Sequence, residues 1–210
     1  MTSSLRRLAP LAILILFNLP LPSMLVPGGG LAAQAVRELI FWMLSALLLV
    51  YVLVAERRPL SSIGLIAPTG KSLLWGGLAG LLMIAGGALF FIVLLPALGL
   101  EEKQDAVQEI AAMPIWFRLL LVLRAPWFEE LTYRGFAIER LTELTGRRWL
   151  AAAISLAVFT LAHLSFWGWA HLIFVAYAAL VLTLLYLWRR DLAACMVAHF
   201  LTDLVGLLMA

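Results

Sequence analysis

The sequence predicts an all-α protein that crosses a membrane several times, and three observations lead to this fold class. The first is composition: of 210 residues, 64% are hydrophobic and only 13% are charged, whereas soluble domains average about 45–50% apolar and about 25% charged residues. The second is the length of the apolar runs, several of which reach the roughly 17–25 residues that a helix needs to cross the hydrocarbon. The third is the placement of basic residues between those runs. One ordinary core cannot hide this much apolar surface, so lipid is the expected solvent and partner for most of it.

Seven apolar stretches are long enough, or nearly long enough, to span. The third is overlong and contains Pro96, which predicts that its helix tilts or ends early. Its Gly76 and Gly80 lie one helical turn apart, a spacing that allows a neighbouring helix to approach closely. We therefore predict about seven transmembrane helices in one domain, residues 1–210. The stretches are 8–26, 39–55, 73–100, 115–138, 150–166, 172–188 and 192–210.

The basic residues predict the orientation of these spans. With a cytoplasmic N-terminus, the segments on the inner side carry ten of them: Arg6, Arg7, Arg57, Arg58, Lys71, Arg140, Arg147, Arg148, Arg189 and Arg190. The outer segments carry only Arg37 and Lys103, and the fourth span contains Arg118, Arg124 and Arg134. This is the positive-inside pattern of a membrane protein. It accounts for the net charge of +3 without a nucleic-acid partner.

The first apolar stretch has a second interpretation. Arg6 and Arg7, the apolar run and the small residues at 33–35 resemble a secretory signal with a cleavage site. The apolar run ends near Phe17, however, which places the small residues far downstream. Pro20 and Pro22 predict a kinked or poorly formed first helix. We favour a retained first span, with cleavage as the alternative.

Ionisable side chains inside the predicted spans need an explanation, because each costs about 2.5–3.5 kcal/mol at the centre of a membrane helix. The fourth span contains Glu129, Glu130 and Arg134, the fifth contains His163, and the seventh contains His199 with Asp203 four residues later. Packing of these three helices would allow the charged groups to share one water-filled pocket.

Each of these sites also has a structural interpretation. Glu130 and Arg134 are four residues apart and can form a structural ion pair. Glu129 has no cation four residues further on, which suits a general base. His163 alone would serve as an interhelical hydrogen-bond partner, and His199 with Asp203 as a hydrogen-bonded pair. The joint occurrence favours the pocket; the remaining histidine, His171 beside Trp167 and Trp169, is expected to be an interfacial anchor.

Three motifs occur in order: Glu-Glu-x-x-x-Arg at 129–134, Phe-x-x-x-His from Phe159 to His163, and His-x-x-x-Asp from His199 to Asp203. Together with their contexts, they resemble the CAAX-protease and bacteriocin-processing membrane peptidases. This family includes the Ras-converting CAAX endopeptidases and many bacterial immunity-type proteins. The resemblance covers a core of about 115–210, and it departs at Asp203, where the family often has Asn.

The resemblance implies an intramembrane endopeptidase for membrane-associated peptides, with a bacterial plasma membrane as the expected location. In its glutamate-type mechanism, Glu129 and His163 activate water. Arg134 holds Glu130 in place. Glu130 and Phe159 both have a supporting role in the site. His199 donates to the oxyanion. An ionised Asp203 cannot donate, so we expect it to orient His199 and keep it protonated.

Two sets of alternatives remain open. In a zinc mechanism, Glu129, His163 and His199 would be the metal ligands; the chain lacks the His-Glu-x-x-His spacing, and we favour chemistry without a metal or other cofactor. At the level of function, the alternatives are a catalytically silent scaffold or immunity factor and a small proton-coupled transporter. We find no internal repeat of the kind that transporters often show.

A difference in depth also needs an explanation. Counted from the cytoplasmic ends of the spans, Glu129 and His199 lie about 10–14 Å deep and His163 about 20 Å deep. A tilted fifth helix, a later start of that helix or a kink at Pro126 would bring the three to one level.

Overall fold

The protein is an all-helical bundle in a computed structural model that describes residues 3–101 and 103–209, with the side chains of 3–8, 104–107 and 208–209 left undescribed. Every regular element in the described part of the chain is a helix, which confirms the all-α prediction. The side chains of Arg6 and Arg7 and the last predicted span residue, Ala210, lie outside the described part.

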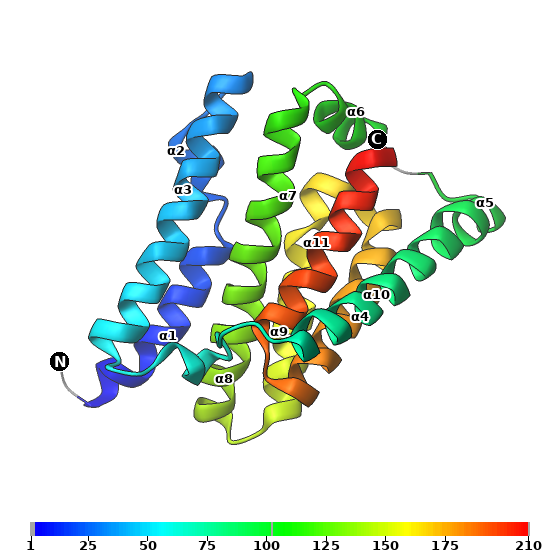
Figure 1. The fold of residues 1–210 in the computed structure, drawn as a ribbon. Helices are drawn as coiled ribbons and strands as arrows, with labels where there is room; N and C mark the ends of the chain where they lie inside the picture. Colours follow the sequence, from blue (N-terminus) through cyan, green and yellow to red (C-terminus); the bar gives the residue numbers. More distant parts are fainter. Residues whose placement is uncertain (1–2, 102, 210) are drawn as a thin grey trace.

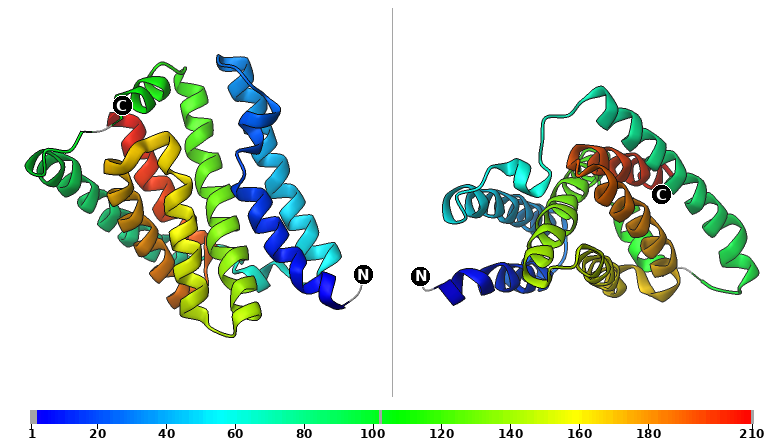
Figure 2. Two further views of the ribbon diagram at one scale, coloured as in Figure 1. Left: turned by 180° about the vertical axis from the view of Figure 1, so that it is seen from behind. Right: turned by 90° about the horizontal axis from the view of Figure 1, so that it is seen from below.

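Successive long helices run in alternating directions between the two ends of the bundle, and the two termini lie at opposite ends (Figures 1 and 2). The N-terminal part comprises α1 (Ser3–Asn18), α2 (Leu21–Leu25) and α3 (Leu31–Val50), which the π-helical η1 (Tyr51–Ala55) extends. After the short 3₁₀-helix η2 (Leu60–Ile63) come α4 (Gly70–Leu89), the π-helical η3 (Phe90–Leu94), α5 (Leu95–Ala97) and α6 (Gln104–Ala111). The C-terminal part comprises α7 (Ile115–Glu129), the π-helical η4 (Glu130–Ala137), α8 (Ile138–Thr145), α9 (Arg148–Ala162), α10 (Leu164–Arg189) and α11 (Leu192–Met209).

Within residues 3–101 and 103–209, three continuous helices are long and apolar enough to cross a membrane: Leu31–Ala55, Gly70–Ala97 and Leu164–Arg189. Shorter apolar helices occur at Ala9–Asn18, Arg148–Ala162 and Leu192–Leu207. The multi-pass character follows from these helices, while the count of seven spans and the cytoplasmic N-terminus stay predictions. The first predicted span is interrupted, because α1 ends at Asn18 and Pro20 precedes the five-residue α2.

The helix α4 crosses α11 closely, as the glycine spacing predicts (Figure 1). A Cβ atom on Gly76 would lie 2.6 Å from the Ala194 carbonyl oxygen, and one on Gly80 would lie 3.2 Å from that of Ala198. Contacts below about 3 Å force the backbones apart, so only glycine permits this approach at position 76. The glycines therefore bring α4 against the turn of α11 that carries His199.

The start of α11 is held by buried hydrogen bonds from two other segments. Asp191 accepts the Ser72 hydroxyl at 2.7 Å on one oxygen and the Ala194 backbone N–H at 3.2 Å on the other. The Leu192 backbone N–H donates to the Gly64 carbonyl at 2.9 Å. An Asp side chain that accepts an N–H of the first turn stabilises a helix start. Two turns later, the same helix presents His199.

The predicted fifth span, 150–166, is wrong in its bounds, because α9 begins earlier and ends at Ala162. His163 lies in the turn between α9 and α10, and Gly168 interrupts the start of α10 with a φ of 78°. Glycine adopts this left-handed conformation without the strain that a Cβ atom would cause. His163 is therefore at a helix end, and a later start of the fifth helix does not explain its depth.

Candidate active site

The two glutamates of the first motif lie at a junction between α-helix and π-helix. Glu129 is the last residue of α7, and Glu130 is the first of the eight π-helical residues of η4, all of which are buried. Pro126 precedes the junction and has no N–H to give to the carbonyl four residues earlier; the Glu130 N–H is shared between the Pro126 and Trp127 carbonyls. Short π-helical segments inside α-helices occur frequently at functional sites. The sequence predicts a regular span here and gives no sign of the π-helix.

A buried hydrogen bond joins η4 to α9. The Ser155 hydroxyl donates to the Tyr133 carbonyl at 2.6 Å. Phe159 follows one turn later on the same face of α9, and His163 comes four residues after Phe159, in the turn that follows α9. The Phe159 ring lies under the Arg134 guanidinium, with 4.2 Å between the Arg134 Cζ and the ring centroid, and its centroid is 4.5 Å from that of the His163 ring. Phe159 thus packs between the cation of the first motif and the imidazole of the second.

The three helices bring Glu129 and two imidazoles together, as the motifs predict. Glu129 Oε2 lies 3.7 Å from His163 Nε2 and 3.9 Å from His199 Nε2. These distances are longer than direct hydrogen bonds. Among the described residues, Glu129 Oε2 meets no hydrogen-bond donor although the atom is buried. Glu129 Oε2 therefore lies near both imidazoles without a direct hydrogen bond to either of them.

Glu130 is in direct contact with its partners. Its Oε1 accepts Arg134 Nη1 at 2.9 Å and pairs with His199 Nδ1 at 2.8 Å, while Oε2 is buried and meets no donor in the described part of the chain. Glu130 and Arg134 are 0% and 1% exposed. The predicted ion pair of Glu130 and Arg134 is present, and it extends to His199 on α11.

Asp203 lies on the other side of the His199 ring. Its Oδ2 is 3.4 Å from His199 Nε2, and its side chain is 31% exposed. The contact that fixes the His199 ring is consequently the shorter bond from Glu130 to Nδ1. The sequence-based interpretation places this orienting contact at Asp203, since the four-residue spacing on one helix is visible in the sequence and the contact between α11 and η4 is not.

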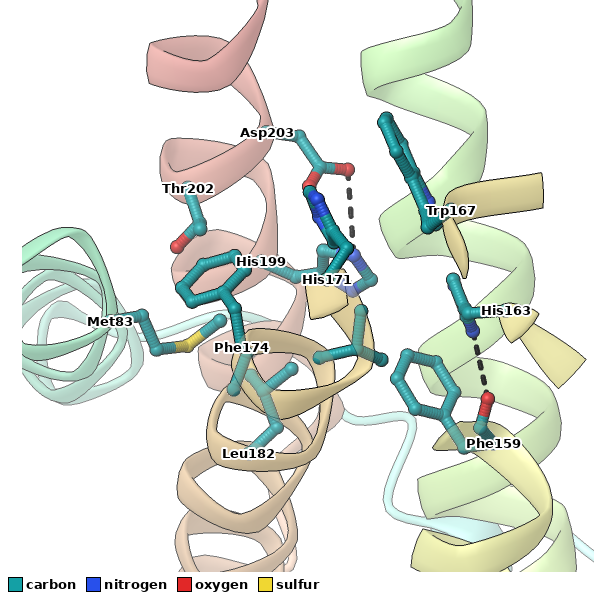
Figure 3. A pocket seen from close by; sticks show the side chains of 12 residues that line it. Met83, Phe159, His163, Trp167, His171, Phe174, Leu182, His199, Thr202 and Asp203 are labelled. Atoms are coloured by element: carbon teal, nitrogen blue, oxygen red, sulfur yellow. Dashed lines mark hydrogen bonds and ion pairs between the residues drawn. The ribbon is translucent and has the colours of Figure 1, made fainter. Parts of the chain in front are cut away.

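A cavity of about 100 Å³ opens beside these groups. Figure 3 shows His163, His199 and Asp203 around it, with Phe159 and Trp167 on one side and Phe174 and Met83 on the other. His171 lines the same cavity and stacks on Trp167 with 4.4 Å between ring centroids. The prediction that His171 is an interfacial anchor stays a prediction. Trp169, in contrast, is 72% exposed, as an anchor would be.

Two charged residues that the sequence did not single out extend the site: one lies near Glu129, and the second pairs with the first. Arg124 Nη1 lies 3.8 Å from Glu129 Oε1, so the glutamate does have a cation near it. Arg124 in turn forms two hydrogen bonds to Glu38 of α3. The available signal was the position of Arg124 within a predicted span, five residues before Glu129. Glu38 precedes the predicted second span by one residue and gave no comparable signal.

The geometry does not favour the metal alternative. Across residues 3–101 and 103–209, no group of three or more His, Cys, Asp or Glu side chains is arranged to hold a metal ion. This also holds for Glu129, His163 and His199, the ligands expected in the zinc mechanism.

The fold and the site define a polytopic helical membrane protein with a cluster of acid–base groups between its helices. Residues 111–205 match a family model described as Type II CAAX prenyl endopeptidase Rce1-like. This segment is similar to that family, whose members are integral membrane proteins, and the match supports a protease. Neither the curated proteins nor the solved structures contain a match.

Proposed function

We propose that this protein is an intramembrane endopeptidase that hydrolyses membrane-associated peptides with a water molecule activated by Glu129 and His163. One observation carries the proposal: Glu129 Oε2 and His163 Nε2 face each other at 3.7 Å with no donor between them. The family match supports the reaction class.

The hydrogen bonds of His163 indicate what belongs in this gap. Its Nδ1 lies 2.8 Å from the Phe159 carbonyl, and a carbonyl only accepts, so Nδ1 carries the proton. In the neutral ring, Nε2 is then an acceptor, and so is the Glu129 carboxylate. Two acceptors are joined by a molecule that donates twice. A water molecule about 2.8 Å from each atom would donate one hydrogen to each of them.

This water is the nucleophile in the proposed reaction. Glu129 takes a proton from it as the oxygen attacks the peptide carbonyl carbon, and the same proton can then pass to the leaving amine. His163 orients the water through its second hydrogen. The cavity beside these groups provides the space for the scissile peptide bond.

In the proposed reaction, His199 stabilises the oxyanion and Asp203 supports it. Glu130 holds Nδ1 of His199, which leaves Nε2 pointing toward Glu129 and Asp203. When His199 is doubly protonated, this Nε2–H can donate to a tetrahedral oxyanion, a contact that strengthens as negative charge develops. Asp203 then balances the charge of the imidazolium. Glu130 and Arg134 act through His199 and Phe159 and do not contact substrate.

The test uses two variants in purified, detergent-solubilised or liposome-embedded protein. Glu129→Gln keeps the size of the side chain but removes the base, and we expect a loss of at least the ~10²–10⁴-fold that general-base catalysis contributes. His163→Ala should show a loss in the same range. Cleavage of a membrane-anchored reporter peptide is the measurement, and size-exclusion chromatography verifies that each variant is folded.

The outcomes separate the alternatives. Wild-type turnover in both variants would exclude the assignment of Glu129 and His163 as catalytic residues. A scaffold or a transporter instead predicts that the wild-type protein does not cleave the peptide. Zinc chemistry predicts that exhaustive chelation abolishes cleavage and that added Zn²⁺ restores it. The mechanism proposed here predicts unchanged cleavage after chelation.

A further inference from the structure

A buried ion pair ties the N-terminal helix α3 to the site. Arg124 Nε and Nη2 donate to the two carboxylate oxygens of Glu38 at 2.8 and 3.0 Å. The Glu38 residue is only 5% exposed, and the Arg124 guanidinium also lies 4.4 Å from the centroid of the Phe41 ring on α3. Glu38 is outside the segment that matches the family model. Helix α3 lies outside the family match, and it is linked to the motif residue Glu129 through Arg124.

The guanidinium uses different edges for the two glutamates. Nε and Nη2 form the parallel pair of bonds to Glu38, while Nη1 points toward Glu129 Oε1 at 3.8 Å. A parallel pair of bonds fixes the plane of a guanidinium as well as its position. The two bonds to Glu38 thus determine how closely the Arg124 guanidinium can approach the Glu129 carboxylate.

The distance of 3.8 Å between Arg124 Nη1 and Glu129 Oε1 decides which contacts Glu129 makes. A guanidinium free to move would form a direct hydrogen-bonded pair with the carboxylate, since such charge-assisted bonds are short, about 2.7–2.9 Å. That movement would draw Glu129 away from His163 and His199, which already lie 3.7 and 3.9 Å from Oε2. Held at 3.8 Å, Arg124 partly balances the charge on Oε1 and leaves Oε2 to the water.

We propose that Glu38 and Arg124 are positioning residues for the catalytic carboxylate, with Glu38 holding Arg124 at the distance that keeps Glu129 directed at the two imidazoles. This inference rests on the proposed function of Glu129. It assigns to α3 a part in the reaction, although α3 contributes no residue to the three motifs.

The chain offers a matched control. Arg140 of α8 and Glu56 form a second buried pair of the same type, in which Arg140 Nε and Nη2 lie 2.9 and 2.6 Å from the two Glu56 oxygens. Arg140 is 2% exposed, and its remaining bonds go to Glu143 and Ser62. Loss of this pair should cost stability without moving Glu129.

The experiment compares Glu38→Gln, Glu38→Asp and Glu56→Gln by kcat per folded molecule, KM and thermal unfolding. For Glu38→Gln we expect kcat to fall about 10- to 100-fold, because a displacement of about 1 Å in a reacting group can cost 10²-fold. KM should change less than about threefold, since Glu38 does not touch substrate. Glu38→Asp keeps the charge and should recover part of kcat. Glu56→Gln should lower the unfolding temperature and leave kcat per folded molecule unchanged.

A double variant tests whether the effect passes through Arg124. Arg124→Met alone should lower kcat, and adding Glu38→Gln should cause little further loss, because both changes remove one interaction path. Equal kcat values for Glu38→Gln and Glu56→Gln would overturn the inference, as would additive losses in the double variant. A failure of the proposed function looks different: Glu129→Gln itself would then retain cleavage.

Discussion

Glu129 and Glu130 are neighbours in the chain, yet they belong to two differently built halves of the site. The paired half consists of Glu130, Arg134 and the Nδ1 side of His199, where polar atoms meet at 2.8–2.9 Å. The open half consists of Glu129, His163, Asp203 and the Nε2 side of His199, where they are 3.4–3.9 Å apart. Glu130 is fully buried and the Glu129 side chain is 15% exposed.

The difference distinguishes groups that hold the structure from groups that can react. A carboxylate bound to two partners at hydrogen-bond distance has little freedom to exchange a proton or to bind water. A carboxylate whose neighbours are too distant for direct bonds can bind a molecule between them. The two halves meet in His199, which is held through one ring nitrogen and leaves the other available.

The largest expected effect on stability comes from breaking the paired half. Glu130→Ala leaves Arg134 buried without its carboxylate, and removing one partner of a buried pair costs about 3–5 kcal/mol. Glu129→Gln, in the open half, should stay within about 1 kcal/mol of the wild type, because a Gln amide can be solvated by the same water. Denaturant unfolding in micelles, followed by tryptophan fluorescence, measures both. Equal losses in the two variants would contradict the division into halves.

A smaller effect is expected at the joint between the halves. Ser155→Ala removes the hydroxyl that binds the Tyr133 carbonyl and should cost about 0.5–1.5 kcal/mol. It should also reduce kcat several-fold, because α9 carries His163. Ser45→Ala is the control: Ser45 is buried and donates to the Phe41 carbonyl at 3.0 Å within α3. If Ser155→Ala and Ser45→Ala lower kcat by the same factor, the Ser155 hydrogen bond does not position α9.

The smallest effect is expected at the exposed edge of the open half. Asp203→Asn keeps a polar group of the same size next to His199 and supplies an N–H that can donate to an oxyanion. We expect kcat within about tenfold of the wild type, less than the cost of removing one oxyanion donor. Steady-state cleavage rates check this. A loss as large as that of Glu129→Gln would show that the carboxylate at 203 is itself required.

Some features of the site were predictable from the sequence because they depend on local chemistry. Ionisable residues in apolar runs are costly, so Glu129, His163, His199 and Asp203 stood out against their surroundings. The pairing of Glu130 with Arg134 follows from their four-residue spacing. Gly76 and Gly80 predicted a close helix contact, which α11 makes.

The tertiary structure decided the rest, because the remaining features depend on segments far apart in the chain. Glu38 and Arg124 are 86 residues apart, and Glu130 and His199 are 69 apart, so no local spacing predicts either contact. The π-helix at η4 packs against α9, whose Ser155 satisfies a carbonyl there. The end of α9 at Ala162 places His163 at a helix end, whereas the sequence predicted it inside a continuous helix. The kink at Gly168 precedes His171, which lines the cavity. By itself, the sequence determined which residues cost free energy to bury. The packing of the helices decided which of these residues are buried next to one another.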